Sequence, residues 1–145
     1  MTRRHAVAAI DGAARGNPGE AGCGIVLEVA GAAREEHCLY LGRATNNVAE
    51  YAALLAALER ARSLGVAALH VRCDSELVVA QMQGSYRVRA RHLLPLWRRA
   101  RELAAGLAAF GIEHVPRAAN AHADRLANRA IDTQTSTLPR PEVLA

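Results

Sequence analysis

The order of apolar segments along this chain constrains its fold more than any other feature of the sequence. Three short segments with strand character come first and a long helical segment follows, after which the order is strand, two helices, strand and helix. The predicted strands span residues 5–11, 22–30, 34–41, 67–73 and 112–115, and the predicted helices span residues 47–64, 75–82 and 96–109, with a last helix capped by Asn120 and ending at residue 131. This order predicts an α/β fold with one mixed sheet flanked by helices.

Length and composition limit the number of domains. The 145 residues suffice for one domain with a real core and are too few for two ordinary domains. We expect residues 1–131 to form that domain and residues 132–145, which are polar and aperiodic, to be a flexible tail or the stub of a linker. No run approaches the roughly 20 apolar residues of a membrane span. We therefore expect a cytoplasmic protein without membrane attachment.

The three cysteines are odd in number, widely spaced and form no CxxC pair. This pattern argues against a disulfide framework and against a zinc site. We interpret Cys23, Cys38 and Cys73 as small core residues.

Basic charge is concentrated in one part of the chain. All 18 basic residues are arginines, and the formal net charge is +4. Residues 77–101 hold no aspartate or glutamate but six arginines. A local patch of one sign predicts a surface for a polyanion.

Four carboxylates occur where an unpaired charge is costly. Asp11 and Asp74 each end a predicted strand, and if these two strands are parallel neighbours, both carboxylates lie at one edge of the sheet. Glu50 and Asp124 each share an apolar face in the first turns of a helix. Taken singly, Asp74 fits a helix cap, and Glu50 and Asp124 fit partners of helix dipoles. Their common occurrence at element ends favours a shared site.

Clustered carboxylates repel one another and need a cation. An all-oxygen site selects hard ions such as Mg²⁺ or Mn²⁺. Beside an arginine patch, this set of residues indicates two-metal hydrolysis of a phosphodiester.

Four sequence blocks carry these acids in order: IDGAARGNPGEAG, GRATNNVAEYAALLAAL, CDSELVVAQ and VPRAANAHADRLAN. Together they resemble type 1 ribonuclease H, and the resemblance extends to about residue 131. It implies a five-stranded mixed sheet with helices on both faces. It further implies an endonuclease that hydrolyses the RNA strand of an RNA/DNA hybrid, leaving 5′-phosphate and 3′-hydroxyl ends, with two Mg²⁺ ions that Mn²⁺ can replace.

The resemblance also assigns roles to individual residues. Asp11, Glu50, Asp74 and Asp124 would be the catalytic metal ligands. Gly12 would let the backbone approach the RNA minor groove. Arg43 and Thr45 match a pocket for a phosphate of the DNA strand. The remaining matched positions would contact RNA, in part through its 2′-hydroxyls, and are Asn17, Asn46, Asn47 and Glu76. Asn47 also fits a helix cap.

The chain departs from many relatives in two regions. Many relatives carry a catalytic-loop histidine about ten residues before the last aspartate. At that distance this chain has His114, which lies inside a predicted strand, and His122 falls only two residues before Asp124. The compact loop resembles a subgroup without that histidine, in which Arg117 would help to release product.

The second departure concerns a basic helical protrusion with tryptophans that some relatives insert between two helices. In that region this chain has only QGSYRVRARHLLPLW. Tyr86 would supply an aromatic wall for the DNA strand, and Arg87, Arg89 and Arg91 would replace part of the protrusion. Trp97 is interpreted as a core residue.

Three functions remain open on the sequence. The leading one is a monomeric ribonuclease H acting on RNA/DNA hybrids. The second is a broader nuclease that also cuts double-stranded RNA. The third is a module of the same fold that binds hybrids without cutting them, against which the retention of all four acids counts.

Overall fold

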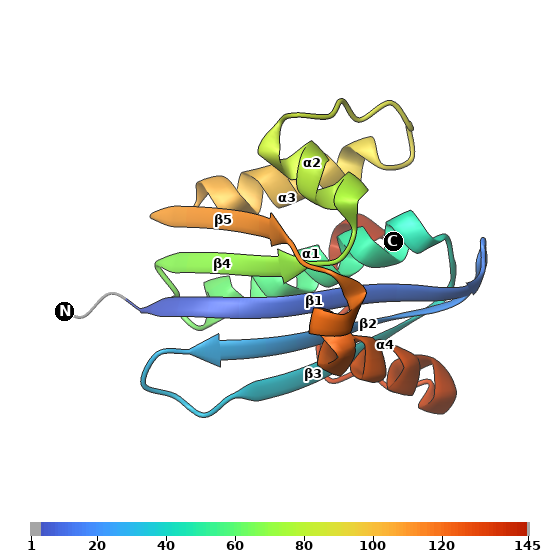
Figure 1. Cartoon of the computed structure of the whole chain (residues 1–145), viewed down its shortest axis with the longest axis horizontal. Coiled ribbons are helices and arrows are strands. Elements are labelled where there is room, and N and C mark those ends of the chain that lie inside the picture. The colour runs from blue at the N-terminus through green and yellow to red at the C-terminus, as the bar shows by residue number, and fades with distance from the viewer. Residues whose placement is uncertain (1–3, 145) are drawn as a thin grey trace.

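A computed structural model of the chain describes residues 4–144. Five strands and four α-helices follow one another in the order β-β-β-α-β-α-α-β-α, with two short 3₁₀ turns near the end (Figure 1). The strands are β1 His5–Gly16, β2 Gly19–Val29, β3 Glu35–Ala44, β4 Ala68–Cys73 and β5 Ala109–His114. The helices are α1 Asn46–Ser63, α2 Glu76–Gln83, α3 Leu94–Ala105 and α4 Ala121–Thr133, and the turns are η1 Arg117–Asn120 and η2 Glu142–Leu144.

The strands form one mixed sheet in the order β3-β2-β1-β4-β5. β1, β2 and β3 are antiparallel neighbours, whereas β4 is parallel to β1 and to β5. The predicted fold class is therefore confirmed. The parallel pairing of β1 with β4 ends at Ile10 opposite Cys73, so that the next residue of each strand, Asp11 and Asp74, lies at the same edge.

Helices cover both faces of the sheet (Figure 1). α1 packs on β1 and β2 from one side, and α4 packs on β2 and β3 from the other. α3 lies against α1. α1 is thus enclosed by the sheet and by a second helix, which explains why it is apolar around most of its circumference.

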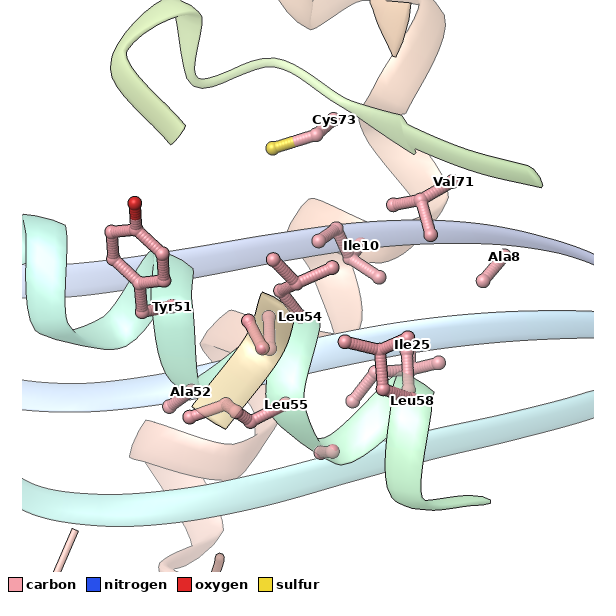
Figure 2. Close-up of a cluster of buried hydrophobic side chains, with 14 of the residues drawn as sticks. Ala8, Ile10, Ile25, Tyr51, Ala52, Leu54, Leu55, Leu58, Val71 and Cys73 are labelled. Atoms are coloured by element: carbon pink, nitrogen blue, oxygen red, sulfur yellow. The ribbon is translucent and has the colours of Figure 1, made fainter. Parts of the chain in front are cut away.

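The core lies between α1 and the sheet. In Figure 2, Leu54, Leu55 and Leu58 of α1 lie over the strands that carry Ile10 and Ile25, and all five side chains are almost fully buried. No helix within residues 4–144 combines the length and hydropathy needed to cross a bilayer.

Several element boundaries differ from the sequence-based ones. β1 continues five residues beyond Asp11, because residues 11–16 pair with β2. α1 begins one residue earlier than predicted, since the Thr45 hydroxyl rather than Asn47 caps it by accepting from the Val48 amide at 3.2 Å. α3 begins at Leu94, with a proline in its first turn, where the missing amide costs nothing.

The segment after α4 lies along the outer edge of β3, which differs from the predicted loose tail. The Thr137 amide donates to the Cys38 carbonyl at 2.8 Å, and the Tyr40 amide donates to the Ser136 hydroxyl at 2.9 Å. Arg140 donates to the carbonyl of Leu41 at 3.0 Å. These contacts satisfy backbone groups that an edge strand otherwise leaves open.

Candidate active site

Asp11 and Asp74 come from neighbouring parallel strands. Asp11 is only 5% exposed, and Asp74 is partly buried just after β4. The cap of α2 is the Ser75 hydroxyl, which accepts from the Val78 amide. The alternative role of Asp74 as a helix cap is therefore excluded, and its carboxylate is left for the cluster.

Glu50 reaches the same edge from the first turns of α1. Its side chain is 7% exposed, and its Oε1 accepts a hydrogen bond from the Gly12 amide. A Cβ at position 12 would overlap the Ala49 carbonyl group. Gly12 is therefore required for the close packing of β1 on α1, in addition to the predicted approach of RNA.

The carboxylates of Asp11, Glu50 and Asp74 form a cluster in which one oxygen of each lies within 4.8 Å of the others. Asp124, at the start of α4, lines the same pocket of about 400 Å³ together with Asp11, Asp74 and Arg117. The structure therefore brings together the four acids that the sequence singles out.

Burial and mutual repulsion perturb these acids. Burial, followed by the nearby charges of Glu50 and Asp74, raises the pKa of Asp11 to about 9. Burial is also the main cause that raises the pKa of Glu50 to about 8, although the Gly12 amide opposes it. The cluster therefore holds protons at neutral pH unless another positive charge replaces them.

The donor set fits a divalent cation. All donors are carboxylate oxygens, which Mg²⁺ and Mn²⁺ prefer over softer ligands. A cation at the cluster would also remove the repulsion that raises both pKa values. Asp11, Glu50 and Asp74 are the residues that would hold it, with Asp124 at the side of the pocket.

Two glycines of β2 set the position of Asp124, and the sequence reasoning missed them. Gly24 pairs with Asp11 in the sheet, and a Cβ on Gly24 would overlap the Ala123 carbonyl oxygen. A Cβ on Gly22 would lie 2.8 Å from the Ala127 carbonyl oxygen. Glycines at i and i+2 of a strand lie on one face, and this spacing is the signal of close backbone approach.

The asparagines expected to contact RNA are partly used inside the protein. Asn46 Oδ1 accepts from the Ala14 amide at 3.1 Å, and Asn17 Oδ1 accepts from the Asn46 amide at 3.0 Å. Within residues 4–144, neither Asn17 Nδ2 nor Asn46 Nδ2 donates a hydrogen bond. These bonds hold the β1–β2 hairpin against the start of α1 and leave two donors at the surface. Asn47 is exposed beside them.

The other expected substrate contacts are exposed at the surface. Arg43 is exposed at the end of β3, two residues before the capping Thr45. Glu76 is exposed at the start of α2. Tyr86 is 61% exposed, and Arg87 and Arg89 are exposed in the segment between α2 and α3.

Comparison with known proteins identifies the family. Residues 9–130 match a family described as reverse transcriptase-like. Ribonuclease HI of Halobacterium salinarum is 48% identical over 123 residues, which are 84% of this chain and 62% of that protein. The crystal structure of RNase H1 from this archaeon superposes with a TM-score of 0.84 at 45% identity, covering 89% of this chain and 98% of that one. The chain belongs to the type 1 ribonuclease H family.

Two further relatives extend the comparison. LC11-RNase H1, solved in complex with an RNA/DNA hybrid, has a TM-score of 0.83 at 39% identity and covers 89% of this chain and 98% of that one. The bifunctional protein Rv2228c of Mycobacterium tuberculosis is 48% identical over 124 residues, 84% of this chain. This chain spans about a third (34%) of the length of that mycobacterial relative.

Arg117 lies in the acidic pocket, whereas His122 has its partner outside it. Arg117 lines the acidic pocket and acts to lower the pKa of Glu50. His122 Nε2 instead lies 2.9 Å from the carboxylate of Glu36 on β3. His114 is exposed at the end of β5.

Replacing His122 by alanine is expected to leave most ribonuclease H activity intact. The imidazole pairs with Glu36 outside the pocket, and an exposed pair of this kind contributes little to stability because solvent screens it. Initial rates on a labelled hybrid, measured beside an Asp124→Asn protein, check this. A loss as deep as that of Asp124→Asn would place His122 in the reaction.

Proposed function

We propose that this chain is an endoribonuclease that hydrolyses the RNA strand of RNA/DNA hybrids. The observation that carries the proposal is the convergence of Asp11, Glu50 and Asp74 from three elements, within 4.8 Å of one another. Support comes from the family and from LC11-RNase H1, a relative solved with an RNA/DNA hybrid.

Asp11, Glu50, Asp74 and Asp124 would hold two Mg²⁺ ions, which Mn²⁺ can replace. When bound, the ions activate a water molecule and stabilise the leaving 3′-oxygen, which gives 5′-phosphate and 3′-hydroxyl products. The protein supplies geometry: the Gly12 amide orients the Glu50 carboxylate, and the register of β1 on β4 places Asp11 beside Asp74.

RNA would be recognised at the hairpin between β1 and β2. The side-chain amides of Asn17 and Asn46 have their oxygens fixed by backbone donors, so that their Nδ2 groups face outward in a defined orientation. A 2′-hydroxyl accepts such a bond and distinguishes RNA from DNA. Asn47 and Glu76 lie at the same surface and complete the proposed RNA contacts.

The DNA strand would lie along two basic surfaces. Arg43 and Thr45 stand at the start of α1, where the positive end of the helix dipole favours a phosphate. Tyr86, Arg87 and Arg89 present a ring and two guanidinium groups between α2 and α3. Arg117, inside the pocket, is proposed to help release the product phosphate.

Replacing Arg87, Arg89 and Arg91 together by alanine is expected to weaken hybrid binding and to flatten its salt dependence. These exposed arginines have no carboxylate within 4.0 Å in residues 4–144, so their charge is available to phosphates. Each lost phosphate contact reduces the slope of log K against log salt by about 1. Fluorescence anisotropy with a labelled hybrid in Ca²⁺ across a salt series measures this slope.

Arg62, in the last turn of α1 and far from Glu50 in the first turns, provides a single-site control. Its replacement by alanine is expected to leave the slope unchanged. A triple variant with the wild-type slope would remove residues 87–91 from the DNA-binding surface.

A substrate panel tests the proposed function. The protein is incubated with Mg²⁺ and labelled RNA/DNA hybrid, double-stranded RNA or double-stranded DNA of one sequence. We expect cleavage of the RNA strand of the hybrid alone. Equal cleavage of double-stranded RNA would favour the broader nuclease, and binding of hybrid without cleavage would favour a binding module.

A further inference from the structure

Arg15, in the β1–β2 hairpin, has partners on α4 that the proposed chemistry does not use. Its guanidinium lies 2.7 Å from the carboxylate of Asp132 and donates to Asn128 Oδ1 at 3.1 Å. The hairpin is thus tied to α4 through one guanidinium nitrogen of Arg15, Nη2. Because Oδ1 of Asn128 receives this bond, its amide nitrogen is directed to the other side.

That amide nitrogen points back along α4 to Asp124. Asn128 Nδ2 donates to the Asp124 carbonyl at 3.0 Å and to the Asp124 carboxylate at 3.3 Å. The two residues are separated by one helical turn, which places them on one face of α4. The contacts run in one direction from Arg15 through Asn128 to Asp124.

Asn120 anchors the opposite side of Asp124. This residue is 2% exposed, and its Nδ2 donates at 2.8 Å to the carbonyl of Ile10, the residue before Asp11. Asn120 and Asn128 lie four residues before and four residues after Asp124. α4 is therefore tied to β1 on both sides of Asp124, to Ile10 just before Asp11 and to Arg15 four residues after it.

Asp124 needs this support more than the other acids of the pocket. Asp11 and Glu50 are buried, and the Gly12 amide holds the Glu50 carboxylate. Asp124 is exposed, and Asn128 donates to its carboxylate from within α4. An exposed carboxylate samples several rotamers unless a neighbouring donor selects one.

We propose that Asn128, held by Arg15, is a positioning residue that orients the Asp124 carboxylate toward the metal ions. This rests on the proposed function, in which Asp124 is a metal ligand. Groups that hydrogen-bond to a metal ligand commonly change metal affinity or activity by about 10- to 100-fold when removed. Because Asn128 and Arg15 are partly exposed, we expect the lower end of that range.

Two variants test the proposal. Asn128→Ala removes the donor, and Asn128→Asp retains an acceptor for Arg15 but cannot donate to Asp124. Both are expected to raise the Mg²⁺ concentration for half-maximal cleavage by about tenfold, with hybrid affinity in Ca²⁺ unchanged. Arg15→Ala should also raise the Mg²⁺ concentration for half-maximal cleavage, but by less than the Asn128 variants do. Arg129→Ala, which removes an exposed arginine of α4 that forms no ion pair within residues 4–144, is the matched control.

Calorimetric titration of Mn²⁺ into each protein without substrate supplies a measurement independent of activity. The Asn128 variants should bind Mn²⁺ more weakly, while Arg129→Ala binds as wild type does. In an Asp124→Ala background, Asn128→Ala should have no further effect, because the residue that it orients is gone.

Wild-type Mn²⁺ affinity and Mg²⁺ dependence in Asn128→Ala would overturn the proposal, as would an undiminished effect in the Asp124→Ala background. These outcomes differ from failure of the proposed function, in which the wild-type protein itself leaves the hybrid intact.

Discussion

Replacing Asp11 by asparagine is expected to reduce hybrid cleavage by on the order of a thousandfold or more, because the proposed metal ligand loses its charge. One carboxylate oxygen of Asp11 lies within 4.8 Å of one oxygen of Glu50 and one of Asp74, so that Asp11 would be among the residues that hold a cation there. Hybrid affinity should change little, since the exposed arginines that would bind phosphates are retained. Single-turnover cleavage and anisotropy separate the two effects.

The same substitution is expected to stabilise the metal-free protein. The folded-state pKa of Asp11 is about 9 against an ordinary value of 3.8, and that of Glu50 is about 8 against 4.5. At pH values between the unfolded-state and folded-state pKa of each group, the folded state binds more protons than the unfolded state, so that stability falls as pH rises. Asp11→Asn removes the contribution of Asp11 to this slope and leaves that of Glu50, and it should add on the order of 2 kcal/mol at pH 8.

Thermal unfolding in a chelator from pH 5 to pH 9 measures this slope, with Glu76→Gln as a control on an exposed acid. Wild-type stability should decline more steeply across the series than that of Asp11→Asn, in which only the contribution of Glu50 remains. Parallel curves for the two proteins would show that Asp11 is ionised in the folded state without a cation.

Replacing Gly24 by alanine is expected to destabilise the protein by about 3 kcal/mol and to suppress cleavage. The new Cβ would overlap the Ala123 carbonyl oxygen and lie 2.7 Å from the Ala127 amide nitrogen. Both atoms belong to the backbone of α4, so the helix must move away from β2. That movement carries Asp124 away from Asp11, its partner across the pocket.

Urea denaturation measures the loss of stability, and cleavage at a temperature where the variant is folded measures the loss of activity. Gly106→Ala is the matched control, because its φ of −77° suits alanine and the nearest atom to a new Cβ is 3.4 Å away. If Gly24→Ala were as stable as Gly106→Ala, α4 would not depend on close contact with β2.

The four acids were predictable because each breaks a local rule. Glu50 on an apolar helix face and Asp11 at the end of an apolar strand are costly unless something shared compensates them. Their convergence follows from topology, since a helical crossover makes β1 and β4 parallel and aligns their ends. Sequence reasoning therefore predicted which carboxylates meet and at which edge of the sheet.

The contacts that hold the acids in place were not predictable in the same way. Arg15 binds Asn128, which is 113 residues away, and Thr137 binds Cys38 across 99 residues. No local period encodes such pairs. The tail after α4 has no periodicity because it follows the edge of β3 through individual bonds. Gly24 carried a readable signal, its spacing from Gly22, but only the position of α4 gives that signal its meaning.

The measurement that tests the central claim most directly is cleavage of a hybrid labelled on its RNA strand, by wild type and by Asp74→Asn, with Mg²⁺ and with a chelator. We predict RNA-strand cleavage by wild type in Mg²⁺ alone, and binding without cleavage by Asp74→Asn. If both proteins bound the hybrid in Mg²⁺ and neither cut it, the acidic cluster would not be a nuclease site. Equal cleavage by both would place the chemistry elsewhere in the molecule.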